Sequence, residues 1–184
     1  MTELSLNILD IAENSVKAGA PLTEITVSVD SAKNLLEIII RDNGCGMSEE
    51  QVKRVIDPFY TTRTTRKVGL GVPFFKESAE AAGGSFSIES ALGVGTTVKA
   101  SYELDNIDRM PMGDLTATIH TLVTMHEDID VLFTYKVNKN EFVLDTRELR
   151  EILGDISFKE YEVSNYIRDY LKENITSVTG EIII

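Results

Sequence analysis

The sequence predicts an α+β fold in which helices cover one face of a β-sheet, and two patterns support this prediction. Apolar residues recur at helical spacing near the N-terminus and again over 72–82. Apolar and polar residues alternate over 25–30, 85–90 and 96–104, which is typical of strands with one solvated face. The expected order over residues 1–104 is helix, two strands, short helix, long loop, helix and two strands, the pattern of a two-layer sandwich.

The first predicted helix begins close to the N-terminus and ends before Pro21. Ser5 is the expected N-cap, Gly19 can end the helix, and Pro21 cannot continue it. The apolar positions lie three or four residues apart, so they share one helix face. They are Leu4, Ile8, Ile11, Ala12 and Val16.

Two strands follow at 25–30 and 35–40, and the short polar turn between them predicts a hairpin. The second strand is almost continuously apolar, which favours a more buried position. It runs directly into a glycine-rich loop over 41–47. Ser48, with Gln51 three residues later, predicts a capped short helix.

Residues 58–72 show no hydrophobic periodicity, and a loop of this length in a compact domain is usually functional or disordered. We interpret residues 105–112 as a linker. We therefore predict one domain over 1–104 and a smaller α+β region over 113–184. That region is expected to hold helices at 113–126, 146–153 and 161–171 and a hairpin over 129–145.

The chain of 184 residues carries a formal charge of −12, of which −8 lies beyond residue 104. Such a surface repels nucleic acids and anionic lipids, so we expect neither as a partner. The one basic stretch holds Arg63, Arg66 and Lys67. A single cysteine, no signal peptide and no apolar run of about 20 residues predict a cytoplasmic protein without a membrane span.

Asp10 and Asn14 lie one helical turn apart on the first helix, so their side chains share a face. A carboxylate and an amide oxygen suit a hard cation such as Mg²⁺, although both residues would also suit a solvated surface helix. Asp42 ends an apolar strand and is followed by Gly44 and Gly46, which permit a tight turn and close approach of a flat ligand. An ordinary Asp-Asn-Gly turn is the alternative.

Two further glycine pairs follow. Gly69 and Gly71, on either side of Leu70, precede the helix over 72–82, and backbone N–H groups at a helix start favour an anion. The turn at Gly93-Val94-Gly95-Thr96-Thr97 joins two strands and would by itself be a simple hairpin turn.

Taken together, these segments resemble the GHKL superfamily, and most closely the histidine-kinase catalytic domain, which has the Bergerat fold, and the anti-sigma-factor kinases. The matching motifs are Asp10–Lys17 as the N box, 41–47, 69–72 and 93–98 as three glycine boxes, and 57–63 as the F box. The resemblance covers about residues 4–104 and implies a mixed sheet with helices on one face.

The resemblance implies ATP and Mg²⁺ as ligands. Asn14 would ligate Mg²⁺, Asp42 would accept from the adenine amine, and Gly44 and Gly46 would shape that pocket. Thr97 would help to hold adenine. Residues 57–71 would form the ATP lid, in which Gly69, Leu70 and Gly71 approach the phosphates and Arg63, Arg66 or Lys67 contacts the γ-phosphate. ATP-hydrolysing members carry Glu where this chain has Asp10, which makes Asp10 the candidate catalytic base.

The leading hypothesis is a kinase that transfers the γ-phosphate of ATP to a partner protein, which the acidic region after residue 104 would dock. An ATP-gated binding module and a slow ATPase with Asp10 as base are the alternatives, and a homodimer is compatible with each. His120 and His126 lack the rest of a phosphoacceptor signature, so we expect both to be packing or surface residues. Tyr161, Tyr166 and Tyr170 are also expected to pack.

Overall fold

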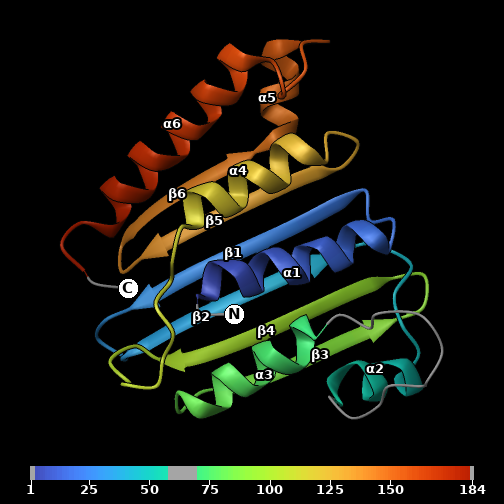
Figure 1. Ribbon diagram of the computed structural model, residues 1–184, viewed down its shortest axis with the longest axis vertical. Coiled ribbons are helices and arrows are strands. Elements are labelled where there is room, and N and C mark those ends of the chain that lie inside the picture. The colour runs from blue at the N-terminus through green and yellow to red at the C-terminus, as the bar shows by residue number, and fades with distance from the viewer. Residues whose placement is uncertain (1–2, 58–69, 183–184) are drawn as a thin grey trace.

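The computed structural model describes residues 3–57 and 70–182 and shows a six-stranded sheet with the strand order β3-β4-β2-β1-β5-β6 (Figure 1). The strands are β1 (Leu22–Asp30), β2 (Leu35–Asp42), β3 (Ser85–Ala91), β4 (Gly95–Glu103), β5 (Asp130–Val137) and β6 (Asn140–Asp145). The helices are α1 (Leu4–Lys17), α2 (Glu49–Ile56), α3 (Gly71–Ala81), α4 (Leu115–Met125), α5 (Thr146–Leu153) and α6 (Tyr161–Thr179).

The sheet is mixed. β1 pairs antiparallel with β2 and parallel with β5, and the other three pairings are antiparallel. The helices lie on one face, with α1 in front of β1 and β2 and α4 and α6 over the β5–β6 hairpin (Figure 1). The predicted α+β fold of the Bergerat type is therefore confirmed.

Burial alternates along the strands, so one face of the sheet is buried and the other is accessible to solvent. In β1, Ile25, Val27 and Val29 are buried, while the residues between them are half-buried. Because successive side chains point to opposite faces, the buried set packs under the helices and the other set faces away. On the open face, the Lys99 ammonium lies 2.5 Å from the Glu37 carboxylate across neighbouring strands.

The start of α1 is held by the predicted linker and not by a cap of its own. Glu3 occupies the N-cap position without a side-chain hydrogen bond, so the expectation of Ser5 as the cap was wrong. Instead, Leu4 N–H donates to the Pro111 carbonyl at 3.0 Å and Ser5 N–H to that of Met112 at 2.8 Å. These bonds satisfy donors that a helix start otherwise leaves unpaired. The capping box of Ser48 and Gln51 on α2 is confirmed.

The second hairpin does not build a sheet of its own. β5 lies beside β1 over eight residue pairs, from Leu22 with Asp130 to Val29 with Val137. Residues on both sides of the linker thus contribute to one sheet and one hydrophobic core. The division into domains at 105–112 stays a prediction about the chain's organisation.

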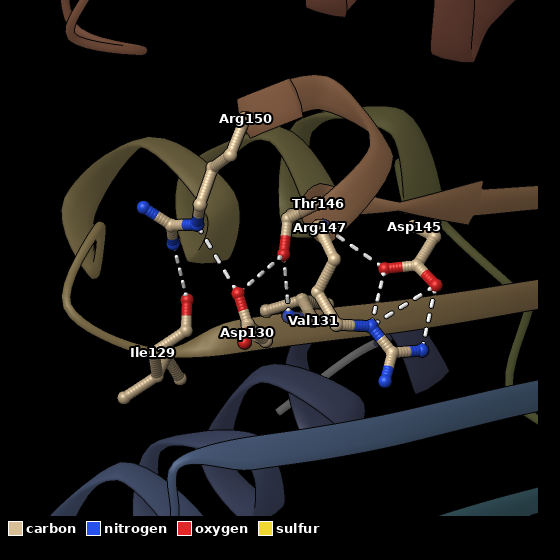
Figure 2. A network of polar contacts seen from close by, with 7 residues as sticks. All are labelled: Ile129, Asp130, Val131, Asp145, Thr146, Arg147 and Arg150. Carbon is tan, nitrogen blue, oxygen red and sulfur yellow. Dashed lines mark hydrogen bonds and ion pairs between the residues drawn. The ribbon is translucent and has the colours of Figure 1, made fainter. Parts of the chain in front are cut away.

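Hydrogen bonds attach α5 to the start of β5 (Figure 2). Val131 N–H donates to the buried Thr146 hydroxyl at 2.8 Å. Arg150 donates from Nε to the Asp130 carboxylate at 3.1 Å and from Nη2 to the Ile129 carbonyl at 2.7 Å. These bonds fix the corner where β6 turns into α5.

The last helix, α6, extends to Thr179, eight residues beyond the predicted end. The expectation that its tyrosines pack was wrong for Tyr161, which is 81% exposed, whereas Tyr166 is 61% exposed but stacks its ring on that of Tyr170. Tyr170 is partly buried and packs against the Phe142 ring. Within the described ranges, no helix combines the length and the apolarity needed to cross a bilayer.

Candidate functional site

A cavity of about 250 Å³ lies between α1, the sheet and the loop after β2. Most of its wall is apolar, so a flat apolar group can be buried there. Polar atoms enter from Asn14, Ser15, Asp42 and Thr96. The aliphatic and sulfur-bearing lining residues are Ile11, Ala18, Ile40, Cys45, Met47, Val55, Val72, Ile88 and Val98, and Gly46 completes the lining.

The Asp42 carboxylate is 8% exposed and is oriented by two neutral donors. Ser15 Oγ–H donates to Asp42 Oδ2 and Gly44 N–H to Asp42 Oδ1, both at 2.9 Å. Among the described residues, no Lys or Arg side chain forms an ion pair with it. Each carboxylate oxygen can accept a further hydrogen bond. Asp42 is therefore a fixed acceptor at the wall of an apolar cavity, which suits an N–H donor on a planar ligand.

The two glycines after Asp42 are sterically required, each for a different reason. A Cβ on Gly44 would lie 2.9 Å from both the Cβ and the carbonyl oxygen of Ala18 at the end of α1. Gly46 has a φ of +66°, and a Cβ there would lie 1.9 Å from the Ala91 carbonyl oxygen. The backbone of this loop therefore passes between α1 and the β3–β4 turn. Gly46 lines the cavity, whereas Gly44 packs behind it.

The turn between β3 and β4 braces this loop, so it is more than a hairpin connection. Gly93 N–H donates to the Cys45 carbonyl at 2.8 Å. The Ser90 hydroxyl accepts from Met47 N–H at 2.8 Å and lies 2.9 Å from the Thr96 hydroxyl. The turn thereby fixes the loop after β2, which forms one wall of the cavity, relative to β4, which contributes another.

Thr97 does not line the cavity, whereas its neighbour Thr96 does. In the sheet register, Thr96 lies opposite Asp42 and Thr97 lies opposite Arg41. Successive strand residues point to opposite faces, so Thr96 shares the face of Asp42 and Thr97 shares the open face. The structure thus places Thr96, and not Thr97, at the wall of the cavity.

Asn14 is exposed on α1 and lines the cavity, and its amide forms no hydrogen bond within the described residues. Asp10, one turn earlier, lies outside the cavity beside the start of α3. A Cβ on Gly71 would lie 3.0 Å from Asp10 Cβ and 3.2 Å from its Oδ2. A carboxylate at a helix N-terminus is stabilised by the helix dipole, so Asp10 has a structural role available besides catalysis.

The start of α3 faces this carboxylate. Leu70 occupies the N-cap position without a side-chain cap and is half exposed, and Gly71 is buried. Pro73 lacks an N–H, so the free donors of this first turn belong to its neighbours. The expected phosphate-contact residues Arg63, Arg66, Lys67 and Gly69 lie outside the described residues, as does most of the expected lid over 57–71.

Sequence reasoning missed Ser15, Cys45, Met47 and Thr96 as lining residues. A signal existed for Ser15, because it lies four residues after Ile11 and so shares the helix face that packs on the sheet. The phase of the β4 alternation gave a signal for Thr96. Cys45 and Met47 sit on an irregular loop, where no periodicity predicts the direction of a side chain.

The fit of a magnesium ion rests on oxygen donors at the cavity edge. Among the described residues, no cluster of three or more His, Cys, Asp or Glu side chains could hold a metal by itself. Mg²⁺ usually keeps several waters and is bound by one or two protein oxygens together with substrate phosphates. The amide oxygen of Asn14, which accepts no hydrogen bond from the described part of the chain, suits that arrangement.

The model of the histidine kinase-, DNA gyrase B- and HSP90-like ATPase family matches residues 2–106. Histidine protein kinase DivJ of Caulobacter vibrioides is 33% identical over 95 residues, which make up 50% of this chain and 16% of that protein. Sensor histidine kinase YvrG of Bacillus subtilis is 32% identical over 94 residues, 49% of this chain and 16% of that protein. The chain thus spans a small part of the length of these relatives.

A solved structure extends the likeness in fold to the second half. The N-terminal domain of a DNA repair protein superposes with a TM-score of 0.58 over 98% of this chain and 58% of its own, at 17% sequence identity. That identity supports the fold alone. The family match covers more than half of the sequence and contains α1, the glycine loops and the cavity, so the chain belongs to the histidine kinase-, DNA gyrase B- and HSP90-like ATPase family.

Proposed function

We propose that this protein binds Mg-ATP in the cavity and transfers the γ-phosphate to a partner protein. The observation that carries the proposal is the buried Asp42 carboxylate, which Ser15 and Gly44 orient towards an apolar cavity. The adenine amine is a donor that can use the remaining lone pairs of Asp42. Guanine has a carbonyl oxygen at the equivalent position, which would face another acceptor.

The size of the cavity supports the base as its occupant. Cavities that enclose a whole drug-sized ligand measure roughly 300–1,000 Å³, and this one measures about 250 Å³. The phosphates would then lie outside, near Asn14 and the start of α3. Thr96 lies opposite Asp42 in the sheet and would contact the base from the β4 side.

Phosphoryl transfer depends mainly on positioning and charge neutralisation. Asn14 would hold the magnesium ion, which neutralises phosphate charge when bound. Backbone donors at Leu70 and Gly71, together with Arg63, Lys67 and Gly69 of the lid, would hold the phosphates. Asp10 would act as a base only if water or an acceptor hydroxyl came within its reach, and its position beside α3 favours a structural role.

The proposal extends to the cellular role, the partners and the location of the protein. Two relatives are named as histidine kinases, which favours signalling by phosphate transfer. The acidic region beyond residue 104 offers a surface for a protein partner, and a homodimer remains compatible with the fold. ATP as substrate and a single cysteine favour the cytoplasm.

The fate of the γ-phosphate tests this function. Purified protein is incubated with γ-labelled ATP, with and without an extract of its source cells. We expect label on a protein of the extract and none when Asn14→Ala replaces the wild type. Free labelled phosphate without a labelled protein would contradict transfer and indicate an ATPase. Binding of ATP without either product would indicate an ATP-gated binding module.

A further inference from the structure

A second hollow lies between α4 and α6, in the half of the chain that the family model does not match. Its volume is about 460 Å³, and it shares no lining residue with the cavity at Asp42. One side comes from α4 and the other from α6, which pack against each other (Figure 1). The lining residues are Asp114, Thr116, Ala117, His120, Thr121, Arg168 and Lys172. We call this hollow the α4–α6 groove.

Two cations of α6 line the groove without a carboxylate partner. Arg168 and Lys172 lie four residues apart, so they project from the same side of the helix. Neither forms an ion pair within the described residues, and Arg168 makes a single 3.3 Å contact from Nη1 to Asn165 Oδ1. Of the 15 Lys and Arg residues in the described ranges, eight form ion pairs with carboxylates, and Arg168 and Lys172 are among the seven that do not.

His120 lies in the groove and is 9% exposed. Its Nε2 lies 3.0 Å from the Ser164 carbonyl oxygen and 2.9 Å from the Ser164 hydroxyl oxygen, so the ring is held against α6. Burial lowers the pKa of His120, and the nearby Arg168 charge lowers it further. The imidazole is therefore neutral at pH 7, and the positive charge of the groove comes from Arg168 and Lys172.

Hydroxyl groups and one acid complete the lining. Thr116 and Thr121 on α4 form no side-chain hydrogen bond within the described residues, so both hydroxyls can donate to a ligand. Asp114 is the acidic residue of the groove. Its Oδ1 accepts from Ala117 N–H at 2.8 Å, which directs the carboxylate to the helix start that it caps.

We propose that the α4–α6 groove binds a phosphate group, either inorganic phosphate or the phosphate of a small monoester. A guanidinium and an ammonium four residues apart, with two hydroxyls opposite, match the several oxygens and the double charge of a phosphate better than a single carboxylate. The volume leaves room for a small organic group beyond the phosphate. This ligand would reach the second half of the chain independently of the nucleotide cavity.

The test is a titration of the ¹⁵N-labelled chain with inorganic phosphate, without nucleotide and at constant ionic strength. We expect saturable shifts of the Thr116, Ala117 and Thr121 amides. Arg168→Gln and Lys172→Gln should each weaken binding by about tenfold, since each removes a charge-assisted contact. Both positions are exposed, so both variants should keep the fold. Lys139→Gln, at an exposed cation of the β5–β6 turn that has no ion pair within the described residues, is the matched control and should bind like the wild type.

Two further titrations identify the ligand chemistry. Glycerol phosphate should bind at least as tightly as inorganic phosphate, and acetate should bind several times more weakly. Shifts that rise linearly with phosphate, or equal affinities of the wild type and both Gln variants, would overturn the proposal. Equal binding of acetate and phosphate would overturn the choice of phosphate. ATP affinity of the cavity should be unchanged in both Gln variants, so this test is separate from that of the proposed function.

Discussion

The cavity at Asp42 and the α5 corner lie on one sheet but use their polar side chains differently. Around the cavity of the first half, the Asn14 amide has no hydrogen-bond partner among the described residues, and Asp42 keeps free acceptor capacity. At the α5 corner of the second half, Thr146, Asp130 and Arg150 are engaged with one another or with backbone (Figure 2). Polar groups with spare capacity at a cavity suit ligand binding, whereas groups that bond to one another and to the backbone hold two elements together.

One helix connects the two halves. The linker carbonyls of Pro111 and Met112 accept hydrogen bonds from the start of α1. Towards the C-terminal end of α1, the Glu13 carboxylate lies 2.7 Å from Nε2 of His126, which follows α4. Glu13 immediately precedes Asn14. A substitution in the second half should therefore change nucleotide binding only if it displaces α1.

The largest effect is expected at the cavity. Asp42→Ala should weaken ATP binding by roughly 10- to 150-fold, because a hydrogen bond to a charged group contributes about 1.5–3 kcal/mol. GTP binding should change much less, since guanine offers no amine to this acceptor. Competition titrations with a fluorescent nucleotide measure both. Equal losses for ATP and GTP would show that Asp42 does not read the base.

The structural joint should respond in stability and not in binding. Thr146→Val keeps the shape of the side chain but leaves the buried Val131 N–H without its acceptor. The free energy of unfolding should fall by about 1–3 kcal/mol, measured by urea denaturation. The control is Thr134→Val on the open face of β5, where no side-chain hydrogen bond is lost. A loss of ATP affinity in Thr146→Val would contradict the separation of the two regions.

A smaller effect separates two neighbouring residues of β4. Thr96→Val should weaken ATP binding about two- to tenfold, the range of one neutral hydrogen bond. Thr97→Val should leave it unchanged, because Thr97 faces the open side of the sheet. The reverse ranking in the same titration would mean that the base binds on the other face.

The pH dependence of stability tests His120. Burial lowers its pKa in the folded chain, so the unfolded chain binds the proton more readily. The neutral imidazole contributes to stability above the unfolded pKa of about 6.5, and this contribution is lost as the pH falls below that value. Urea denaturation between pH 7.5 and 5.5 should show a decline that is shallower in His120→Gln. Parallel declines would contradict a buried neutral His120.

Much of the local structure was predictable from short-range patterns. The helix over 146–153 was predicted with the limits that α5 has, and in the structure Asp145 caps its start and Gly154 follows its end. Phe133 and Tyr135 alternate with polar residues and are buried as that pattern predicts. Hairpins formed by neighbouring strands were also predictable, because their turns are short.

Long-range features were not predictable in the same way. The parallel pairing of β1 with β5 joins segments about 100 residues apart, and no local pattern encodes such a register. The cap of α1 comes from Pro111 and Met112 for the same reason. At the site, motif matching located the turn before β4 but not which of Thr96 and Thr97 faces the cavity. Which of the two side chains faces the cavity depends on the pairing register of β4 with β2.

The measurement that tests the central claim most directly is a calorimetric titration of the whole chain with ATP, in Mg²⁺ and in excess EDTA, for the wild type and Asn14→Ala. Asn14 is exposed on α1 and alanine is a good helix former, so the thermal unfolding of the variant should match the wild type. We expect saturable 1:1 binding of Mg-ATP to the wild type, weaker binding in EDTA, and loss of the magnesium-dependent part in Asn14→Ala. Absence of binding to the wild type, or identical magnesium-dependent binding in Asn14→Ala, would contradict an Mg-ATP site in this cavity.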